Sequence, residues 1–156
     1  MMPLGFWKLL YLLSTFSLAA CVMSSHWIVL AARRVDDWGR RFTLFEATRR
    51  VSLRFGLASI LMIALCANLT RLSLGSRRPW DGWLLWTDAL CLIALAVLAL
   101  VELPAARALA HEARRAIHQG PSGSFDRALG RWRLGNATLL VLSVASIGML
   151  VLRWWN

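Results

Sequence analysis

The chain has 156 residues, of which 58% are hydrophobic, and its formal net charge is +10. Its mean hydropathy of +0.57 is too high for a soluble domain of this size, because such a domain could not bury so much apolar surface in its own core. Composition therefore excludes a soluble globular protein and indicates an integral membrane protein.

Four long apolar stretches account for most of the chain, and they cover residues 5–32, 55–74, 82–104 and 134–155. Each stretch is about as long as the ~20 residues with which a helix crosses a hydrocarbon layer ~30 Å thick. The segments between them are short, so we expect a single membrane domain over residues 1–156. Short connections make consecutive helices antiparallel neighbours, which predicts an all-α, up-down four-helix bundle.

Arginine is distributed unevenly between the two sides of this predicted bundle. Thirteen arginines lie in the segments 33–54 and 105–133, whereas the other side has five basic residues: Lys8, Arg71, Arg77, Arg78 and Arg153. The positive-inside rule then places both basic segments in the cytoplasm and both termini in the periplasm of a bacterial inner membrane. Topology thus explains the net charge, and we expect anionic lipid headgroups at the cytoplasmic face as partners, and no nucleic acid.

In the first half of the chain, a helical pattern continues beyond the apolar stretch. Val35, Trp38, Phe42 and Phe45 recur at helical spacing among arginines. This spacing predicts that the first span extends into the cytoplasm as an amphipathic helix. The second span then returns to the periplasmic side, where the turn-forming residues 75–79 end it.

The third span is predicted to bend and then to continue into the cytoplasm. Pro104 lacks an amide hydrogen and clashes with the carbonyl group four residues earlier, so we expect a kink near Leu100–Pro104. An amphipathic helix follows through His118, and a Gly-Pro-Ser-Gly sequence breaks it. Ser124 or Asp126 then caps the last helix, because either side chain can accept a hydrogen bond from a free amide of the first turn.

The periplasmic side of the predicted bundle carries aromatic anchors and one ion pair. Indole rings prefer the interface between lipid and water, so we expect tryptophans to mark this boundary. They are Trp80, Trp83, Trp86, Trp154 and Trp155. Asp88 of the third span is expected to pair with Arg71 at the end of the second span.

Ionisable groups inside a hydrocarbon layer are costly, so each one is a candidate functional residue. At 1.5 Å per residue, His26, Arg54, Glu102, Trp132 and Asn136 lie at a comparable depth near the cytoplasmic face. We expect a buried polar network in which Glu102 accepts hydrogen bonds from Arg54 and orients the imidazole of His26. Such a network is a structural seam between helices, a proton relay or cofactor site, or a surface for headgroups or a partner subunit.

No cofactor or metal is predicted, although haem b and copper stay open as alternatives. A bis-histidine haem needs two facing imidazoles, and His26 lies within a span whereas His111 lies in a cytoplasmic segment. Cys21, Cys66 and Cys91 fall on three spans at similar depth. Thiolates can bind Cu(I), but buried cysteine usually packs as a small apolar side chain. The sequence has no metal-binding Cys or His motif and no catalytic motif, so we expect a protein that is not an enzyme.

Four motifs occur in order along the chain. They are Trp7-Lys-Leu-Leu-Tyr11 in the first span, Trp83-Leu-Leu-Trp86 at the start of the third, Leu103-Pro104 at its cytoplasmic end, and Arg131-Trp-Arg-Leu-Gly-Asn-Ala137 at the start of the fourth. Together they resemble the DUF2269 family of bacterial four-helix inner-membrane proteins. That family is distantly similar to the CopD copper-resistance and HemJ protoporphyrinogen-oxidase bundles.

The resemblance implies the four-span architecture but argues against an enzyme. Relatives typically have a histidine, a natural haem or metal ligand, where this chain has Tyr11. The lysine expected in the third span of the HemJ type has no counterpart between Leu84 and Val101. If those residues carry the chemistry of the relatives, this chain has lost it, because His26 is offset from the Tyr11 position by about four turns.

These observations predict a non-catalytic membrane protein that works by contact. The leading hypothesis is an accessory or assembly subunit of a larger inner-membrane complex, for example one for electron transfer, with other membrane subunits or a second copy of the chain as partners. The first alternative is a protein that binds haem b or copper. The second alternative is a small transporter or proton conduit.

Overall fold

The computed structural model describes residues 4–73, 82–120 and 122–155, and the regular structure of these residues is helical. The elements are α1 (Leu4–Arg34), α2 (Trp38–Val51), η1 (Ser52–Gly56), α3 (Leu57–Ser73), α4 (Gly82–Val97), η2 (Leu98–Glu102), α5 (Leu103–Gln119) and α6 (Gly123–Trp155). The π-helical turns η1 and η2 continue the α-helices on either side of them without a break. We therefore call α2–η1–α3 the second helix and α4–η2–α5 the third helix, between α1 and α6.

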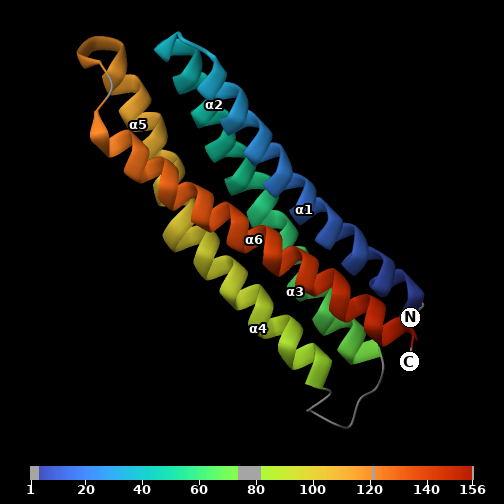
Figure 1. The fold of residues 1–156 in the computed structure, drawn as a ribbon. Coiled ribbons are helices and arrows are strands. Elements are labelled where there is room, and N and C mark those ends of the chain that lie inside the picture. Colours follow the sequence, from blue (N-terminus) through green and yellow to red (C-terminus); the bar gives the residue numbers. More distant parts are fainter. Residues whose placement is uncertain (1–3, 74–81, 121, 156) are drawn as a thin grey trace.

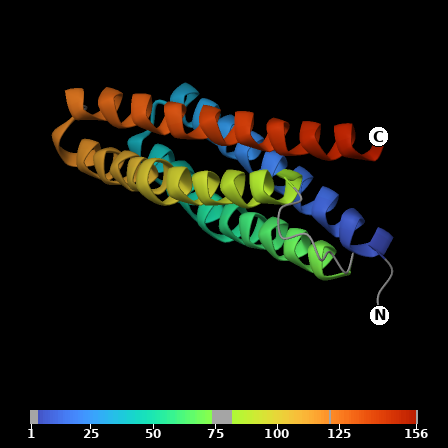
Figure 2. The same cartoon turned by 90° about the horizontal axis from the view of Figure 1, so that it is seen from below.

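Consecutive long helices run in opposite directions along one axis (Figure 1). The start of α1 and the end of α6 lie at one end of the molecule, and the junctions α1–α2 and α5–α6 lie at the other end (Figure 2). Each long helix is long and apolar enough to cross a membrane. The prediction of an all-helical fold with four apolar, membrane-length helices is therefore confirmed, and it indicates a multi-pass membrane protein.

The boundary between the first two long helices differs from the prediction. The amphipathic residues after Arg34 do not extend α1 but form α2, which packs against α1 and α5. The carboxylate of Asp37 accounts for the difference, because it accepts a hydrogen bond from the Gly39 amide at 3.0 Å and caps the new helix. The predicted cytoplasmic extension of the first span is therefore wrong, and residues 38–51 lengthen the second helix instead.

The third helix follows the prediction more closely. It continues to Gln119, and Gly120 ends it with a φ of 77°, a conformation that glycine adopts without steric cost. The π-turn η2 lies where the kink before Pro104 is expected, and in it the Leu103 amide donates to the Leu98 carbonyl oxygen; the kink itself stays a prediction. Residues 105–119 therefore form the amphipathic extension that the sequence predicts.

The last helix begins at Gly123, which is earlier than the predicted caps Ser124 and Asp126. Ser122 precedes it, and the Ser122 hydroxyl donates to Oε2 of Glu112 on α5 at 2.6 Å. Because α6 starts one residue before Ser124, both predicted caps lie inside the helix, and the prediction of the capping residue is wrong.

Two apolar cores lie one after the other along the long axis. Buried residues of the core nearer the chain ends are Tyr11, Leu18, Val22, Ile60, Ile63, Leu98 and Leu139. Those of the second core are Val29, Phe45, Ala105, Ala106, Leu109, Leu129 and Trp132. Between the two cores each long helix places a buried polar residue, and we call these four the polar layer: Ser25, Ser52, Glu102 and Asn136.

Gly135 allows α6 to approach the third helix beside the polar layer. A Cβ atom on Gly135 would lie 3.2 Å from Cγ1 of Val101 and 3.3 Å from Cα of Glu102. We expect Gly135→Ala to lower the free energy of unfolding by about 1–3 kcal/mol, because the added methyl group overpacks the contact. The midpoint of thermal unfolding in detergent measures this loss.

Gly130→Ala is the matched control on the same helix. A Cβ atom there meets nothing within 4 Å, so alanine should raise the stability by about 0.5–1 kcal/mol through its better helix propensity. A midpoint for Gly135→Ala that equals or exceeds the midpoint for Gly130→Ala would contradict the close approach of the two helices.

Candidate functional site

Glu102 carries a carboxyl group into the interior of an apolar helical protein. The residue is 1% exposed, and its Oε1 accepts a hydrogen bond of 2.6 Å from the Ser52 hydroxyl. The hydroxyl oxygens of Ser52 and Ser25 are also hydrogen-bonded, at 3.2 Å. A continuous chain of polar groups, Ser25–Ser52–Glu102, therefore connects the first, second and third helices.

Each of the two residues in the Ser52–Glu102 hydrogen bond lies in a π-turn. Ser52 is the first residue of η1, and Glu102 is the last residue of η2. A π-turn widens the helix by accommodating one extra residue, and such turns are frequent at functional sites. Pro104 favours the turn in the third helix, because it cannot donate a regular helical hydrogen bond.

The fourth long helix contributes Trp132 and Asn136, which lie one turn apart and hence on one face. Both are buried, with Trp132 1% exposed. The indole of Trp132 stacks against the imidazole of His26, with 6.3 Å between the ring centroids and 20° between the planes. His26 itself is half-buried on α1. The aromatic pair thus joins α1 to α6 next to the polar layer.

Three buried polar atoms of this region have no hydrogen-bond partner among the described residues. They are Oε2 of Glu102, Nε1 of Trp132 and Oδ1 of Asn136. The indole nitrogen is a donor, the amide oxygen an acceptor, and a carboxyl oxygen either one according to its protonation. The region therefore contains both donor and acceptor groups whose hydrogen-bonding capacity is unused among the described residues.

The structure buries part of the predicted polar network, but among the described residues no hydrogen bond joins any two of its four members, and the partner of Glu102 is Ser52. Glu102 and Asn136 are buried and His26 is half-buried, whereas Arg54 is exposed. Arg54 follows Ser52 by two residues, and residues two apart lie on nearly opposite faces of a helix. Because Ser52 faces Glu102, Arg54 faces outward, and the predicted Arg54–Glu102 contact is wrong.

The predicted features of the opposite end lie partly outside the described residues. Trp80 is not described, and neither are the side chains of Arg71, Trp83, Trp154 and Trp155. Trp86 is 61% exposed on α4, which fits an interfacial anchor. Asp88 is half-buried on the same helix. The Arg71–Asp88 ion pair stays a prediction.

The cysteines lie on three different long helices, and all three are buried and free. Cys21 makes a contact of 3.6 Å through its sulfur with the Val51 carbonyl oxygen, and Cys66 and Cys91 belong to the apolar core nearer the chain ends. Within the described residues, no three His, Cys, Asp or Glu side chains form a group that could hold a metal ion. Of the histidines proposed for haem, His111 is exposed on α5.

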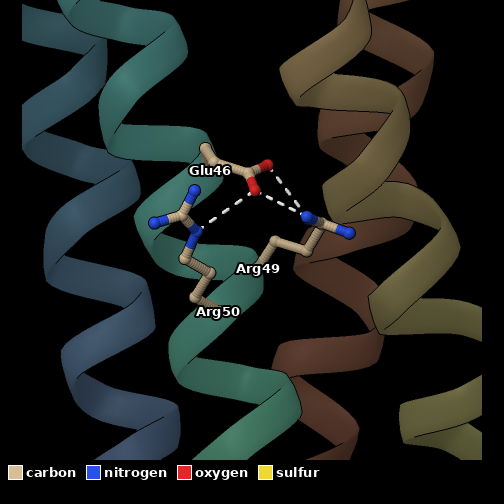
Figure 3. Close-up of polar contacts among 3 residues, drawn as sticks. All are labelled: Glu46, Arg49 and Arg50. Carbon is tan, nitrogen blue, oxygen red and sulfur yellow. Dashed lines mark hydrogen bonds and ion pairs between the residues drawn. The ribbon is translucent and has the colours of Figure 1, made fainter.

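Glu46 holds two arginines of α2 (Figure 3). Its Oε2 accepts a hydrogen bond from Nε of Arg49 at 3.0 Å, and its Oε1 accepts one from Nε of Arg50 at 3.3 Å. By contrast, Arg127 and Arg131 of α6 form no ion pair with any residue that the structure describes. The basic end of the molecule therefore contains both paired and unpaired guanidinium groups.

Sequence reasoning missed two residues of the site, Ser25 and Ser52. Serine is common in membrane helices, where its hydroxyl usually bonds to a backbone carbonyl of its own helix, so neither residue stands out by type. Their depth could have identified them, because Ser25 adjoins His26 and Ser52 lies half a turn from Arg54. Neither a protein-family model, nor a curated protein, nor a solved structure matches this chain.

We expect Ser52→Ala to destabilise the protein although it removes a single oxygen atom. The substitution leaves the buried Glu102 carboxyl without its donor and breaks the link to Ser25, at a cost of about 1–3 kcal/mol. The midpoint of thermal unfolding in detergent should therefore fall. Ser24→Ala is the control, since Ser24 is the exposed neighbour of Ser25 on α1; equal midpoints for the two variants would contradict a structural role of the Ser52–Glu102 hydrogen bond.

Proposed function

We propose that the chain crosses a bacterial inner membrane four times, with both termini in the periplasm. The four apolar helices support this proposal, and so does the position of the basic residues. Arg33 and Arg34 end α1, Arg40 and Arg41 begin α2, and Arg127 lies near the start of α6. They gather at the end with the α1–α2 and α5–α6 junctions (Figure 1), which the positive-inside rule assigns to the cytoplasm.

Single added cysteines test this orientation. The native cysteines are buried, so a membrane-impermeant maleimide should label mainly an added, exposed thiol. We expect Gly5→Cys to react in cells whose outer membrane alone is permeable, and His118→Cys to react only after the inner membrane is opened. Both positions are exposed. The reverse pattern would contradict the proposed orientation.

We further propose that the protein works by contact, as an accessory or assembly subunit of a larger membrane complex. The observation that carries this proposal is a groove of about 280 Å³ between α1 and the second helix. We call it the α1–α3 groove, and its lining residues are Leu13, Ser14, Ser17, Phe55, Ala58, Ser59 and Met62.

The chemistry of the α1–α3 groove suits a transmembrane helix. Ser59 donates a hydrogen bond to the Ser17 hydroxyl at 3.0 Å, and Ser17 and Ala58 are exposed. The Ser17 hydroxyl accepts this bond, but its own hydrogen has no acceptor among the described residues; lipid tails offer none, whereas a second helix can both fill the groove and accept that hydrogen bond. Small residues also let two helix backbones approach closely. The groove therefore favours a helix of a partner subunit over lipid.

Native electrophoresis of membranes extracted in mild detergent tests the proposed contact. We expect the wild-type chain to migrate in an assembly larger than the monomer, and Ala58→Leu to release the monomer because leucine fills the groove. Val144→Leu is the control, since Val144 is exposed on α6, away from the groove.

Three results would count against an accessory role. A wild-type chain that migrates only at monomer mass contradicts the proposal outright. An Ala58→Leu variant that assembles as well as the wild type excludes the α1–α3 groove as the contact. An assembly that contains only copies of this chain identifies the partner as a second copy rather than another subunit.

A further inference from the structure

A cleft separates the third helix from α6 beside the polar layer. Its volume is about 330 Å³, and its lining includes Leu100, Pro104, Glu112, Ser124, Arg127 and Arg131. The cleft is distinct from the α1–α3 groove, because the two share no residue.

The chemistry of this cleft changes along its length. One end is apolar, with Leu100 76% exposed and Pro104 exposed beside it. Glu112 and Ser124 lie at the other end, and between the two ends α6 contributes first Arg131 and then Arg127. From Leu100 to Glu112 the helix rises about 18 Å, at 1.5 Å per residue. The headgroup region on each side of a bilayer is about 5–8 Å thick, as the difference between total and hydrocarbon thickness implies. The cleft is therefore long enough to reach from lipid tails past the headgroups.

The two arginines of the cleft are available to an anion. Arg127 and Arg131 are one turn apart on one face of α6, and both are exposed. Neither forms an ion pair among the described residues, in contrast to Arg49 and Arg50, which Glu46 holds.

The acidic residue of the cleft has its own partner. Oε2 of Glu112 accepts a hydrogen bond from Ser122, and no ion pair joins Glu112 to either arginine within the described part of the chain. Because the negatively charged Glu112 repels an anion, we expect a bound anion to lie at Arg127 and Arg131.

We propose that this cleft binds one anionic glycerophospholipid. Its phosphate group lies between Arg127 and Arg131, and one acyl chain follows the apolar surface of Leu100 and Pro104. A planar guanidinium can donate two parallel hydrogen bonds to a phosphate, which makes a pair of arginines one turn apart a suitable site. The inference rests on the proposed membrane insertion but is independent of the proposed partner subunit.

Lipid titration of the detergent-solubilised full chain, followed by native mass spectrometry, tests the proposal. The probes are phosphatidylglycerol and phosphatidylcholine with identical acyl chains. We expect tighter binding of phosphatidylglycerol by the wild type. Two well-placed arginines contribute on the order of 2 kcal/mol, so the double variant Arg127→Gln/Arg131→Gln should weaken that binding about 30-fold.

The control variant Arg33→Gln/Arg34→Gln removes the same charge from the exposed end of α1 and should keep the wild-type affinity. Leu100→Asn tests the apolar end, and it should weaken both lipids by a similar factor. Wild-type protein that binds the two lipids equally overturns the proposal, and so does a control variant that loses as much affinity as the double variant.

Inorganic phosphate separates a lipid site from a site for a soluble anion. We expect phosphate at millimolar concentration to leave phosphatidylglycerol bound, because it lacks the acyl chain. Displacement of the lipid by phosphate alone would overturn the lipid assignment. A different result would contradict membrane insertion, namely a chain that stays in solution without detergent. Equal binding of the two lipids would contradict the lipid site but not membrane insertion.

Discussion

The hydrogen bond from Ser52 to Glu102 is the contact on which the arrangement of the helices depends. A carboxyl group inside an apolar protein is tolerated only where a donor reaches it, and Ser52 meets this requirement from a neighbouring helix. Apolar contacts are less directional than a hydrogen bond. A shift of one turn, about 5.4 Å, would separate the Ser52 hydroxyl from the Glu102 carboxyl. The hydrogen bonds Ser25–Ser52–Glu102 thus favour one register of the first three long helices.

The π-turns and Gly135 both help to bring the residues of the polar layer close together. Each π-turn occurs in the helix that supplies one member of the hydrogen bond, so the chain changes its local geometry where the polar contact must form. Gly135 removes a side chain where α6 crosses Glu102, which brings Asn136 to the same level. A hydrogen bond between helices in lipid contributes only about 0.6–1.7 kcal/mol. Its effect on the fold therefore lies more in specifying one register than in total stability.

Sequence reasoning predicted the parts of this structure that local composition determines. The apolar stretches, the extension of the third helix and its end at Gly120 follow from hydropathy and from glycine and proline. The pattern from Trp38 to Phe45 was assigned to the wrong helix, because amphipathic spacing has no direction, and the cap at Asp37 decides it. Depth along the axis correctly grouped Glu102 with its neighbours. It could not distinguish Ser52 from Arg54, since depth gives the height of a residue and not the face on which it lies.

The fixed register also determines which surfaces the protein offers to its surroundings. The α1–α3 groove needs Ser17 and Ser59 at one height, and the lipid cleft needs Leu100 of η2 beside Arg131 of α6. Both conditions depend on helices that meet at Glu102, through the Ser25–Ser52–Glu102 hydrogen bonds and through the packing of Gly135 against Glu102. A loss of register would therefore disturb the two surfaces together, even though they share no residue. Under the proposed contact function, the buried carboxyl is then needed for function without touching any partner, because it holds the helices that form both proposed binding surfaces.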